Sequence, residues 1–106
     1  MAQAKTENFS KNEIELAEFA KALSHPARIK ILQILTDKNL CMCGDIVELL
    51  PLSQSTVSQH LKELKKVGLI SGEIEGPKTC YCVNNNTIQK VKKEFDKLFS
   101  RVCNCT

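Results

Sequence analysis

The residues with the most evident chemistry are six cysteines, which form three pairs with one residue between the members: Cys41/Cys43, Cys80/Cys82 and Cys103/Cys105. A thiolate is a soft ligand, so closely spaced pairs favour thiophilic ions over hard ones such as magnesium or calcium. Cys43 stands just before an expected helix, where free backbone N–H groups stabilise a thiolate. The spacing therefore predicts binding of a soft metal ion or metalloid.

The compartment decides whether these thiols stay reduced. In a small secreted protein, six cysteines would indicate disulfides, but the first residues, MAQAKTENFSKNE, contain no apolar signal-peptide core. The longest apolar run is also far shorter than the roughly 20 residues of a membrane span. We therefore expect a soluble cytoplasmic protein with reduced thiols and no membrane partner.

Length and composition indicate one domain. The chain has 106 residues, 42% of them hydrophobic, and a net charge of +3. We expect a single domain over residues 1–106, with a flexible tail at 1–10 and a Cys-containing tail at 103–106. The mild positive charge permits a nucleic-acid partner without requiring one.

Hydrophobic periodicity and helix breakers predict a mostly α protein with a small β-hairpin. Helices are expected over residues 12–23, 26–36, from 44 or 45 to 50, from the Ser53 cap to Gly68, and from caps at 84–86 to 102; strands are expected over 40–42, 69–74 and 78–83. Pro26 fits the first helical position after a cap at Ser24 or His25. Short helices separated by a Pro-containing turn, then a polar-faced helix and a hairpin, describe a winged helix-turn-helix.

The helix after Ser53 has a polar face that suits contact with DNA. Short hydroxyl and amide side chains hydrogen-bond base edges in the major groove, while lysines contact phosphates. A solvated surface helix can have the same composition, but the basic hairpin that follows favours the DNA-reading interpretation. The candidate DNA-binding residues are Ser53, Gln54, Ser55, Thr56, Ser58, Gln59, His60, Lys62 and, on the hairpin, Lys78.

Neither histidine marks a catalytic site. His60 has no partner at a metal-ligand spacing, so a hydrogen bond to DNA or to a neighbouring helix is the better interpretation, and His25 fits a cap or surface position. The chain has no Ser/His/Asp set, Gly-rich phosphate loop or paired-carboxylate motif. We therefore expect a binding protein and not an enzyme.

The last expected helix carries a narrow apolar seam whose members advance by steps of three and four residues, as in helices that pack along one line. An ordinary amphipathic helix that covers its own core is the alternative. Because the other helices already compete for a small core, the seam favours a homodimer. The candidate interface comprises Leu16, Phe19, Ile88, Val91, Phe95, Leu98, Phe99 and Val102.

Three segments together resemble a known family: residues 22–32 (ALSHPARIKIL), 40–46 (LCMCGDI) and 53–62 (SQSTVSQHLK), the last followed by Gly68-Leu69-Ile70. In this order they look like the ArsR/SmtB family of bacterial metal-sensing repressors. The resemblance implies a homodimer, paired through its first and last helices, on an inverted-repeat operator of double-stranded DNA. It further implies that the dimer represses a promoter until a thiophilic metal or metalloid releases the DNA.

The resemblance also implies where the inducer binds. In arsenic- and cadmium-responding members, a Cys-x-Cys at the place of Cys41 and Cys43 carries the inducer. Arsenic-responding members often have a third cysteine shortly afterwards, which residues 44–47 do not supply. Zinc-sensing members use carboxylates and histidines on the last helix, and a zinc site is disfavoured here. The corresponding positions hold Asn85, Thr87, Leu98 and Arg101.

The hairpin offers further thiolates. In a winged helix, the short strand before the third helix pairs with the second hairpin strand, which would bring Cys41 beside Cys80 and Cys82. Residues two apart on a strand share a face, so these two thiols would point together while Tyr81 and Val83 point into the core. We hypothesise an inducer site within one subunit; the alternative is that the hairpin cysteines only fill half-exposed strand positions. The candidate ligands are Cys41, Cys43, Cys80 and Cys82, with Cys103 and Cys105 as further candidates.

The favoured inducer is As(III) or Sb(III), and otherwise Cd(II) or Pb(II); no cofactor is required for folding. Two other classes stay open: a repressor of the same fold that senses thiol redox state or persulfides, and a metal-binding chaperone or buffer without an operator.

Overall fold

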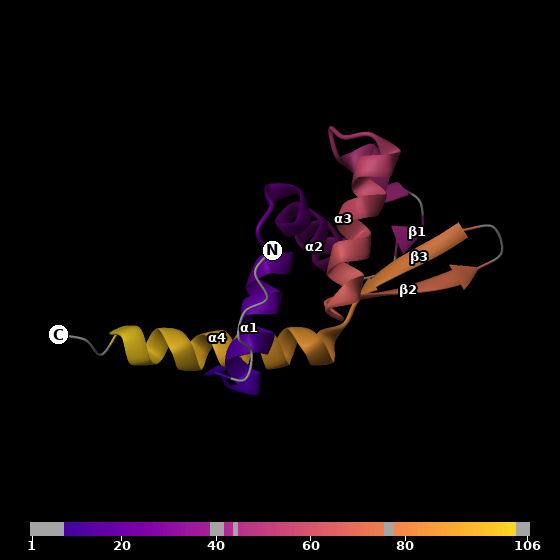
Figure 1. Cartoon of the computed structure of the whole chain (residues 1–106). Coiled ribbons are helices and arrows are strands. Elements are labelled where there is room, and N and C mark those ends of the chain that lie inside the picture. The colour runs from indigo at the N-terminus through magenta and orange to yellow at the C-terminus, as the bar shows by residue number, and fades with distance from the viewer. Residues whose placement is uncertain (1–7, 39–41, 44, 76–77, 104–106) are drawn as a thin grey trace.

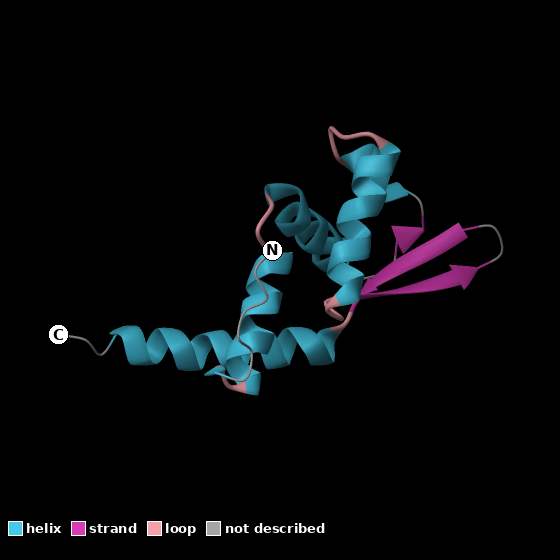
Figure 2. Ribbon diagram, viewed as in Figure 1, coloured by secondary structure: helices cyan, strands magenta, loops and turns pink. Residues whose placement is uncertain are grey.

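A computed structural model of the chain describes residues 8–38, 42–43, 45–75 and 78–103 (Figure 1). The elements in chain order are α1 (Lys11–Ala22), α2 (Pro26–Lys38), β1 (Met42–Cys43), the 3₁₀-helix η2 (Asp45–Leu49), α3 (Gln54–Lys66), β2 (Ile70–Glu75), β3 (Lys78–Val83) and α4 (Asn85–Cys103). Helices dominate, and the strands gather at one end, as the sequence predicts (Figure 2). Within the described residues, no helix has the length and apolar character needed to cross a membrane.

Side-chain caps set the first two helix starts. The Ser10 hydroxyl accepts the backbone N–H of Glu13 at 3.1 Å, and the Glu13 carboxylate accepts the N–H of Ser10 at 2.9 Å, so α1 begins with a capping box. Nδ1 of His25 accepts the N–H of Ala27 at 3.0 Å, which makes His25 the capping residue of α2. Ser10 thus belongs to a helix cap, whereas the sequence predicted a flexible tail over 1–10; residues 1–7 lie outside the described residues.

The third helical segment is a 3₁₀-helix, where the sequence predicted an α-helix ending at residue 50. The N–H of Leu50 bonds the carbonyl of Val47 at 3.3 Å, an i to i−3 bond. Because Pro51 follows at once, the segment is too short to accumulate the i to i−4 bonds of an α-helix.

The sheet has the strand order β1-β3-β2, with antiparallel neighbours. β2 and β3 form the predicted hairpin, and β1 pairs with β3, so the predicted pairing of the short strand is confirmed. The described part of that strand starts at Met42, opposite Tyr81. Residues 39–41, where the sequence predicted its first half, lie outside the described residues.

The core is aliphatic and lies between the helices and the sheet. Its largest fully buried side chains are Ile31, Leu35, Ile46, Val57, Leu64, Leu69 and Ile70. Since α3 supplies Val57, Leu61 and Leu64 to this core, its polar side is held towards solvent. Gly68 ends α3 with φ of 83°, a left-handed conformation that favours glycine, as the sequence predicted for the residue after the helix.

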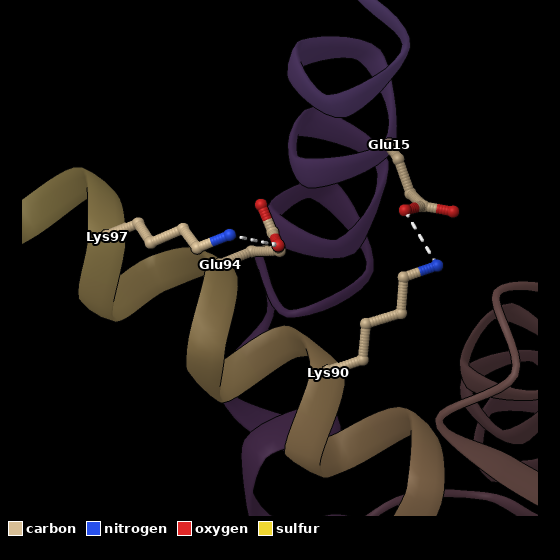
Figure 3. Close-up of polar contacts among 4 residues, drawn as sticks. All are labelled: Glu15, Lys90, Glu94 and Lys97. Carbon is tan, nitrogen blue, oxygen red and sulfur yellow. Dashed lines mark ion pairs between the residues drawn. The ribbon is translucent and has the colours of Figure 1, made fainter.

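Helix α4 crosses α1 and continues beyond it (Figure 1). Asn84 begins it by accepting the N–H of Thr87 at 3.3 Å. Lys90 joins the two helices through an ion pair with Glu15, Nζ to Oε1 2.9 Å, while the pair between Lys97 and Glu94 stays within α4 (Figure 3). Exposed pairs of this kind contribute about 0–1 kcal/mol, so apolar packing decides how α4 lies on α1.

Candidate functional site

The exposed side of α3 is polar along its first turns and has no acidic residue in the first turn. The burial of Val57, Leu61 and Leu64 turns this side away from the core. The structure therefore places most of the predicted DNA-binding residues in solvent around the first half of one helix. The exposed ones are Ser53, Gln54, Ser55, Thr56, Ser58, Gln59 and Lys62.

The hydroxyls at the start of α3 bond one another. The Ser53 hydroxyl accepts the backbone N–H of Thr56 at 3.3 Å, and its Oγ lies 2.9 Å from the Thr56 Oγ1 and 3.3 Å from the Ser55 Oγ. These bonds fix the first turn. In the described part of the chain, Gln54 and Gln59 make no side-chain hydrogen bond, so their amides are available to base edges.

His60 lies on the inner side of α3, apart from the exposed polar residues. Its side chain is 7% exposed, and its Nδ1 accepts a hydrogen bond from the Nε of Arg28 at 3.1 Å. Its ring centroid lies 4.3 Å from that of His25. Burial, followed by the positive charge facing it from His25 and Arg28, lowers the pKa of His60. Of the two hydrogen bonds predicted for His60, the structure contains the one to a neighbouring helix.

The sequence predicted a hydrogen bond from His60 to a neighbouring helix as one alternative, but not the burial of His60, which helical spacing could have revealed. His60 follows Val57 by three residues and precedes Leu64 by four, which places it on their buried side. Its partner Arg28 lies 32 residues earlier, a separation that no local pattern indicates.

Two lysines lie on or beside the hairpin. Lys78 is the first residue of β3 and pairs with Glu75 at the end of the ladder, while its side chain lies outside the described part. Lys65 of α3 extends over β2, where its Nζ would lie 3.3 Å from a Cβ at Gly72. Lys65 therefore carries a positive charge to the junction between α3 and the hairpin.

The sheet brings two cysteine pairs together. Cys43 lies opposite Cys80 across the β1–β3 ladder, the position that the sequence predicted for Cys41, and Cys82 follows two residues along β3. Cys41 lies outside the described residues. Tyr81 packs against the core, as predicted, and so does Val83. The alternative that both hairpin cysteines are half-exposed is wrong for Cys80, which is 5% exposed, whereas Cys82 is half-buried.

The oxidation state of the hairpin thiols differs from the expected one. Cys80 and Cys82 are each disulfide-bonded, although the sequence predicted reduced thiols. Directly opposite residues of an antiparallel ladder have Cβ atoms about 4.5–5.5 Å apart.

The described side chains include no group of three His, Cys, Asp or Glu residues placed to hold a metal ion. Two predicted ligands, Cys41 and the side chain of Cys43, lie outside that part of the chain. Cys103 is the last residue of α4 and an exposed free thiol, where the sequence placed it just beyond the helix. Cys105 lies outside the described residues.

The predicted dimer seam divides into two parts. Phe19 and Val91 are buried in the chain's own core, and Ile88 and Phe95 pack against it, with Leu16 half-buried. The last turns of α4 remain open, with Leu98 42%, Phe99 55% and Val102 58% exposed. Of the predicted seam, only these last turns of α4 are fully available for contact with another chain.

These elements define the class of protein. The helix η2, the turn after it, the polar helix α3 and the hairpin β2–β3 form a winged helix-turn-helix, in which α3 is the recognition helix. The chain belongs to the arsR family: the family described as "Bacterial regulatory protein, arsR family" matches residues 25–71. It is a DNA-binding transcriptional regulator and not an enzyme, as the sequence predicted.

Two named relatives and one solved structure agree with membership of the arsR family. The chain is 34% identical to the "Arsenical resistance operon repressor" of Staphylococcus xylosus over 82 residues, which cover 77% of this chain and 78% of the relative. It is 33% identical to the "Cadmium resistance transcriptional regulatory protein CadC homolog" of Staphylococcus aureus over 95 residues, 88% of this chain and 78% of the relative. The structure of HlyU from Vibrio cholerae superposes with a TM-score of 0.67 at 29% identity, covering 91% of this chain and all of that one.

Proposed function

We propose that this protein is a repressor that leaves its operator when a thiophilic metal or metalloid binds its thiolates. The inducer is As(III) or Sb(III), and otherwise Cd(II) or Pb(II). The observation that carries the proposal is the register that sets Cys43 opposite Cys80, with Cys82 two residues away. The names of the relatives from the two Staphylococcus species support an arsenical or cadmium inducer.

The site lies within one subunit. It consists of thiolates from the segment before η2 and from β3, the donor type that soft ions prefer. We expect Cys41 to complete it, because the antiparallel ladder that pairs Met42 with Tyr81, continued by one residue, would set position 41 opposite Cys82. Binding requires reduced thiols, so the disulfides at Cys80 and Cys82 must be reduced first.

Release follows from the position of Cys43, which lies two residues before the first residue of η2. Ile46 of η2 is 1% exposed and packs in the same core as Val57 and Leu61 of α3. A metal ion that ties Cys43 to β3 therefore displaces the start of η2 against the recognition helix. A coupling of about 1–3 kcal/mol is sufficient for a large change in operator occupancy.

The repressor is a homodimer on an inverted-repeat operator. Two recognition helices about 34 Å apart would enter successive major grooves. The exposed apolar end of α4, formed by Leu98, Phe99 and Val102, supplies unpartnered surface for a second copy.

The test is a fluorescence-anisotropy titration of DNA release under reducing conditions. The probe is a duplex selected from a random pool by the wild-type chain, and arsenite, antimonite, Cd(II) and Zn(II) are added in turn. Arsenite or antimonite should release the wild-type protein, whereas the variants Cys43→Ser and Cys80→Ser should need at least about tenfold more, the fold that 1.4 kcal/mol represents. Cys103→Ser is the matched control and should respond as the wild type does. Equal release of all four proteins would refute the assigned site.

A second candidate function is thiol redox or persulfide sensing, which the disulfides at Cys80 and Cys82 favour. It predicts DNA release by an oxidant such as hydrogen peroxide in the presence of a chelator, with no effect of arsenite on the reduced protein. A metal buffer without an operator would select no duplex from the pool.

A further inference from the structure

Within the described residues, a buried polar contact joins the recognition helix to α2. Most of the buried surface of α3 is aliphatic, and His60 is the buried polar side chain of the described residues. It meets Arg28 of α2 at 3.1 Å, Nε to Nδ1. A buried hydrogen bond is directional, whereas apolar contacts are not, so this bond fixes how far α3 is rotated against α2.

The chemistry of the bond fixes the protonation state of His60. A guanidinium group has only donors and stays charged at all ordinary pH values. Nδ1 of His60 must therefore carry a lone pair, so the imidazole is neutral. Protonation at Nδ1 would place one N–H against another and add a second positive charge beside Arg28.

Among the described residues, no acidic side chain forms an ion pair or hydrogen bond that offsets that charge. The ring of His25, which caps α2, lies tilted at 44° against that of His60, and its own Nδ1 accepts the Ala27 N–H. The described ion pairs include none with His25, Arg28 or His60. Glu63, one turn further along α3, makes no hydrogen bond or ion pair with His60 within the described residues. The groups that face the imidazole are thus positive or neutral, in agreement with its lowered pKa.

Arg28 also carries the contact to α1. One of its terminal nitrogens lies 3.4 Å from the carbonyl of Lys21 and 3.4 Å from that of Ala22, at the carboxyl end of α1. The guanidinium therefore bridges the helix that crosses α4 and the helix that reads DNA. The orientation of one depends on the other through a single side chain.

We propose that the Arg28–His60 bond is a proton-gated link that positions the recognition helix, so that only the protein with neutral His60 binds DNA at full affinity. The inference rests on the DNA-binding function proposed above. Arg28 and His60 are positioning residues, since neither lies on the exposed side of α3. Acidification breaks the bond, lets α3 rotate and weakens DNA binding.

The sign of this effect sets it apart from ordinary electrostatics. A surface histidine that gains a proton adds a positive charge and strengthens binding to phosphates. Here, protonation weakens binding. At pH values below the pKa of His60, the affinity for DNA should fall by up to about tenfold per pH unit for each recognition helix. By the same linkage, bound DNA must lower the pKa of His60, whereas a histidine in contact with phosphate would show a raised pKa in the complex.

The experiment measures affinity for the selected duplex from pH 5 to pH 8 at constant ionic strength, with far-UV circular dichroism at each pH to restrict the comparison to folded protein. Wild type should lose affinity on acidification. His60→Asn, whose amide oxygen can replace Nδ1 as an acceptor and does not titrate, should remove the pH dependence. His25→Asn keeps a capping acceptor and should retain it.

A second readout does not depend on any variant folding. In the wild-type protein, ¹⁵N NMR should show His60 with an unprotonated Nδ1 at pH 7 and a lower pKa in the DNA complex. An affinity that is constant or rises on acidification, or a higher pKa of His60 in the complex, would overturn the inference. If the pool yields no duplex, the DNA-binding function fails instead, whereas the protonation state at pH 7 is still measured.

Discussion

Tyr81 lies opposite Gly72 on the hairpin, and a methyl group at Gly72 would come within 3.2 Å of the Tyr81 Cε1. The Nζ of Lys65 would be 3.3 Å from the same methyl. Glycine therefore leaves room for a tyrosine ring and a lysine to cover the strand. The pair explains how α3 packs against the hairpin at this point.

A larger side chain at Gly72 should disturb that packing. Gly72→Val forces the Tyr81 ring and Lys65 outwards, and we expect a loss of about 1–3 kcal/mol in the free energy of unfolding. Urea denaturation followed by circular dichroism measures it. Ser71→Val, at the neighbouring exposed position, is the control and should stay within about 0.5 kcal/mol of wild type.

Removal of the cap at α3 should weaken both stability and DNA binding. Ser53→Ala deletes the acceptor of the Thr56 N–H, at a cost of about 1 kcal/mol. Ser58→Ala, an exposed serine on the same helix, removes no described hydrogen bond and serves as the control for stability. Equal unfolding midpoints in urea for the two variants would show that the cap contributes nothing.

Stability should fall as the solution is acidified through the titration of His60. Because the folded-state pKa of His60 is lowered, the unfolded chain binds the proton more readily, so the free energy of unfolding rises with pH between the two pKa values. The contribution is complete above the unfolded value of about 6.5 and is lost as the pH falls below it towards the folded value. Urea titrations from pH 5 to pH 8 should show this slope in wild type and a shallower one in His60→Asn; parallel slopes would contradict it.

The open end of α4 should control assembly. Phe99 is 55% exposed and stacks on Phe95 with ring centroids 5.8 Å apart. Phe99→Glu places a charge in the proposed interface and should shift the dimer to monomer in sedimentation equilibrium. Ser100→Glu, exposed on the same helix, should leave the assembly unchanged. A wild-type chain that sediments as a monomer at all concentrations would exclude the homodimer.

Lysine contacts with phosphate should appear in the salt dependence. Lys62 is exposed on the recognition helix, so Lys62→Gln should reduce the slope of log affinity against log salt by about 1. Lys92→Gln on α4 is the control, because its Nζ pairs with Asp96 away from α3. Equal slopes for Lys62→Gln and Lys92→Gln would show that Lys62 does not contact phosphate.

Most of the architecture could be predicted from the sequence, because the features that set the helix ends and the strands act between residues close together in the chain. Ser53, Gly68 and the alternating residues of β3 act through hydrogen bonds and periodicity within a few residues. The pairing of β1 with β3 followed from the topology of the winged helix alone.

What sequence reasoning missed depends on contacts between distant residues. The partner of His60 is 32 positions away. The register that places Cys43 opposite Cys80 joins strands that lie far apart in the sequence. Whether Phe19 and Val91 serve the chain's own core or a second subunit is decided by the crossing of α1 and α4, which periodicity alone does not specify.

The hairpin and the start of the long helix α4 meet at a hydrogen-bonded junction with the end of α3. The N–H of Asn84 bonds the carbonyl of Leu69, and the N–H of Leu69 bonds the carbonyl of Leu64, so the end of β3 is fastened to the end of α3 just where α4 begins. α4 is about 28 Å long at 1.5 Å per residue. A tilt of about 5° at its first turn would therefore displace its last turn by about 2.5 Å. In the proposed homodimer, a lever of this length would turn a small shift at the hairpin into a change in the distance between the two recognition helices.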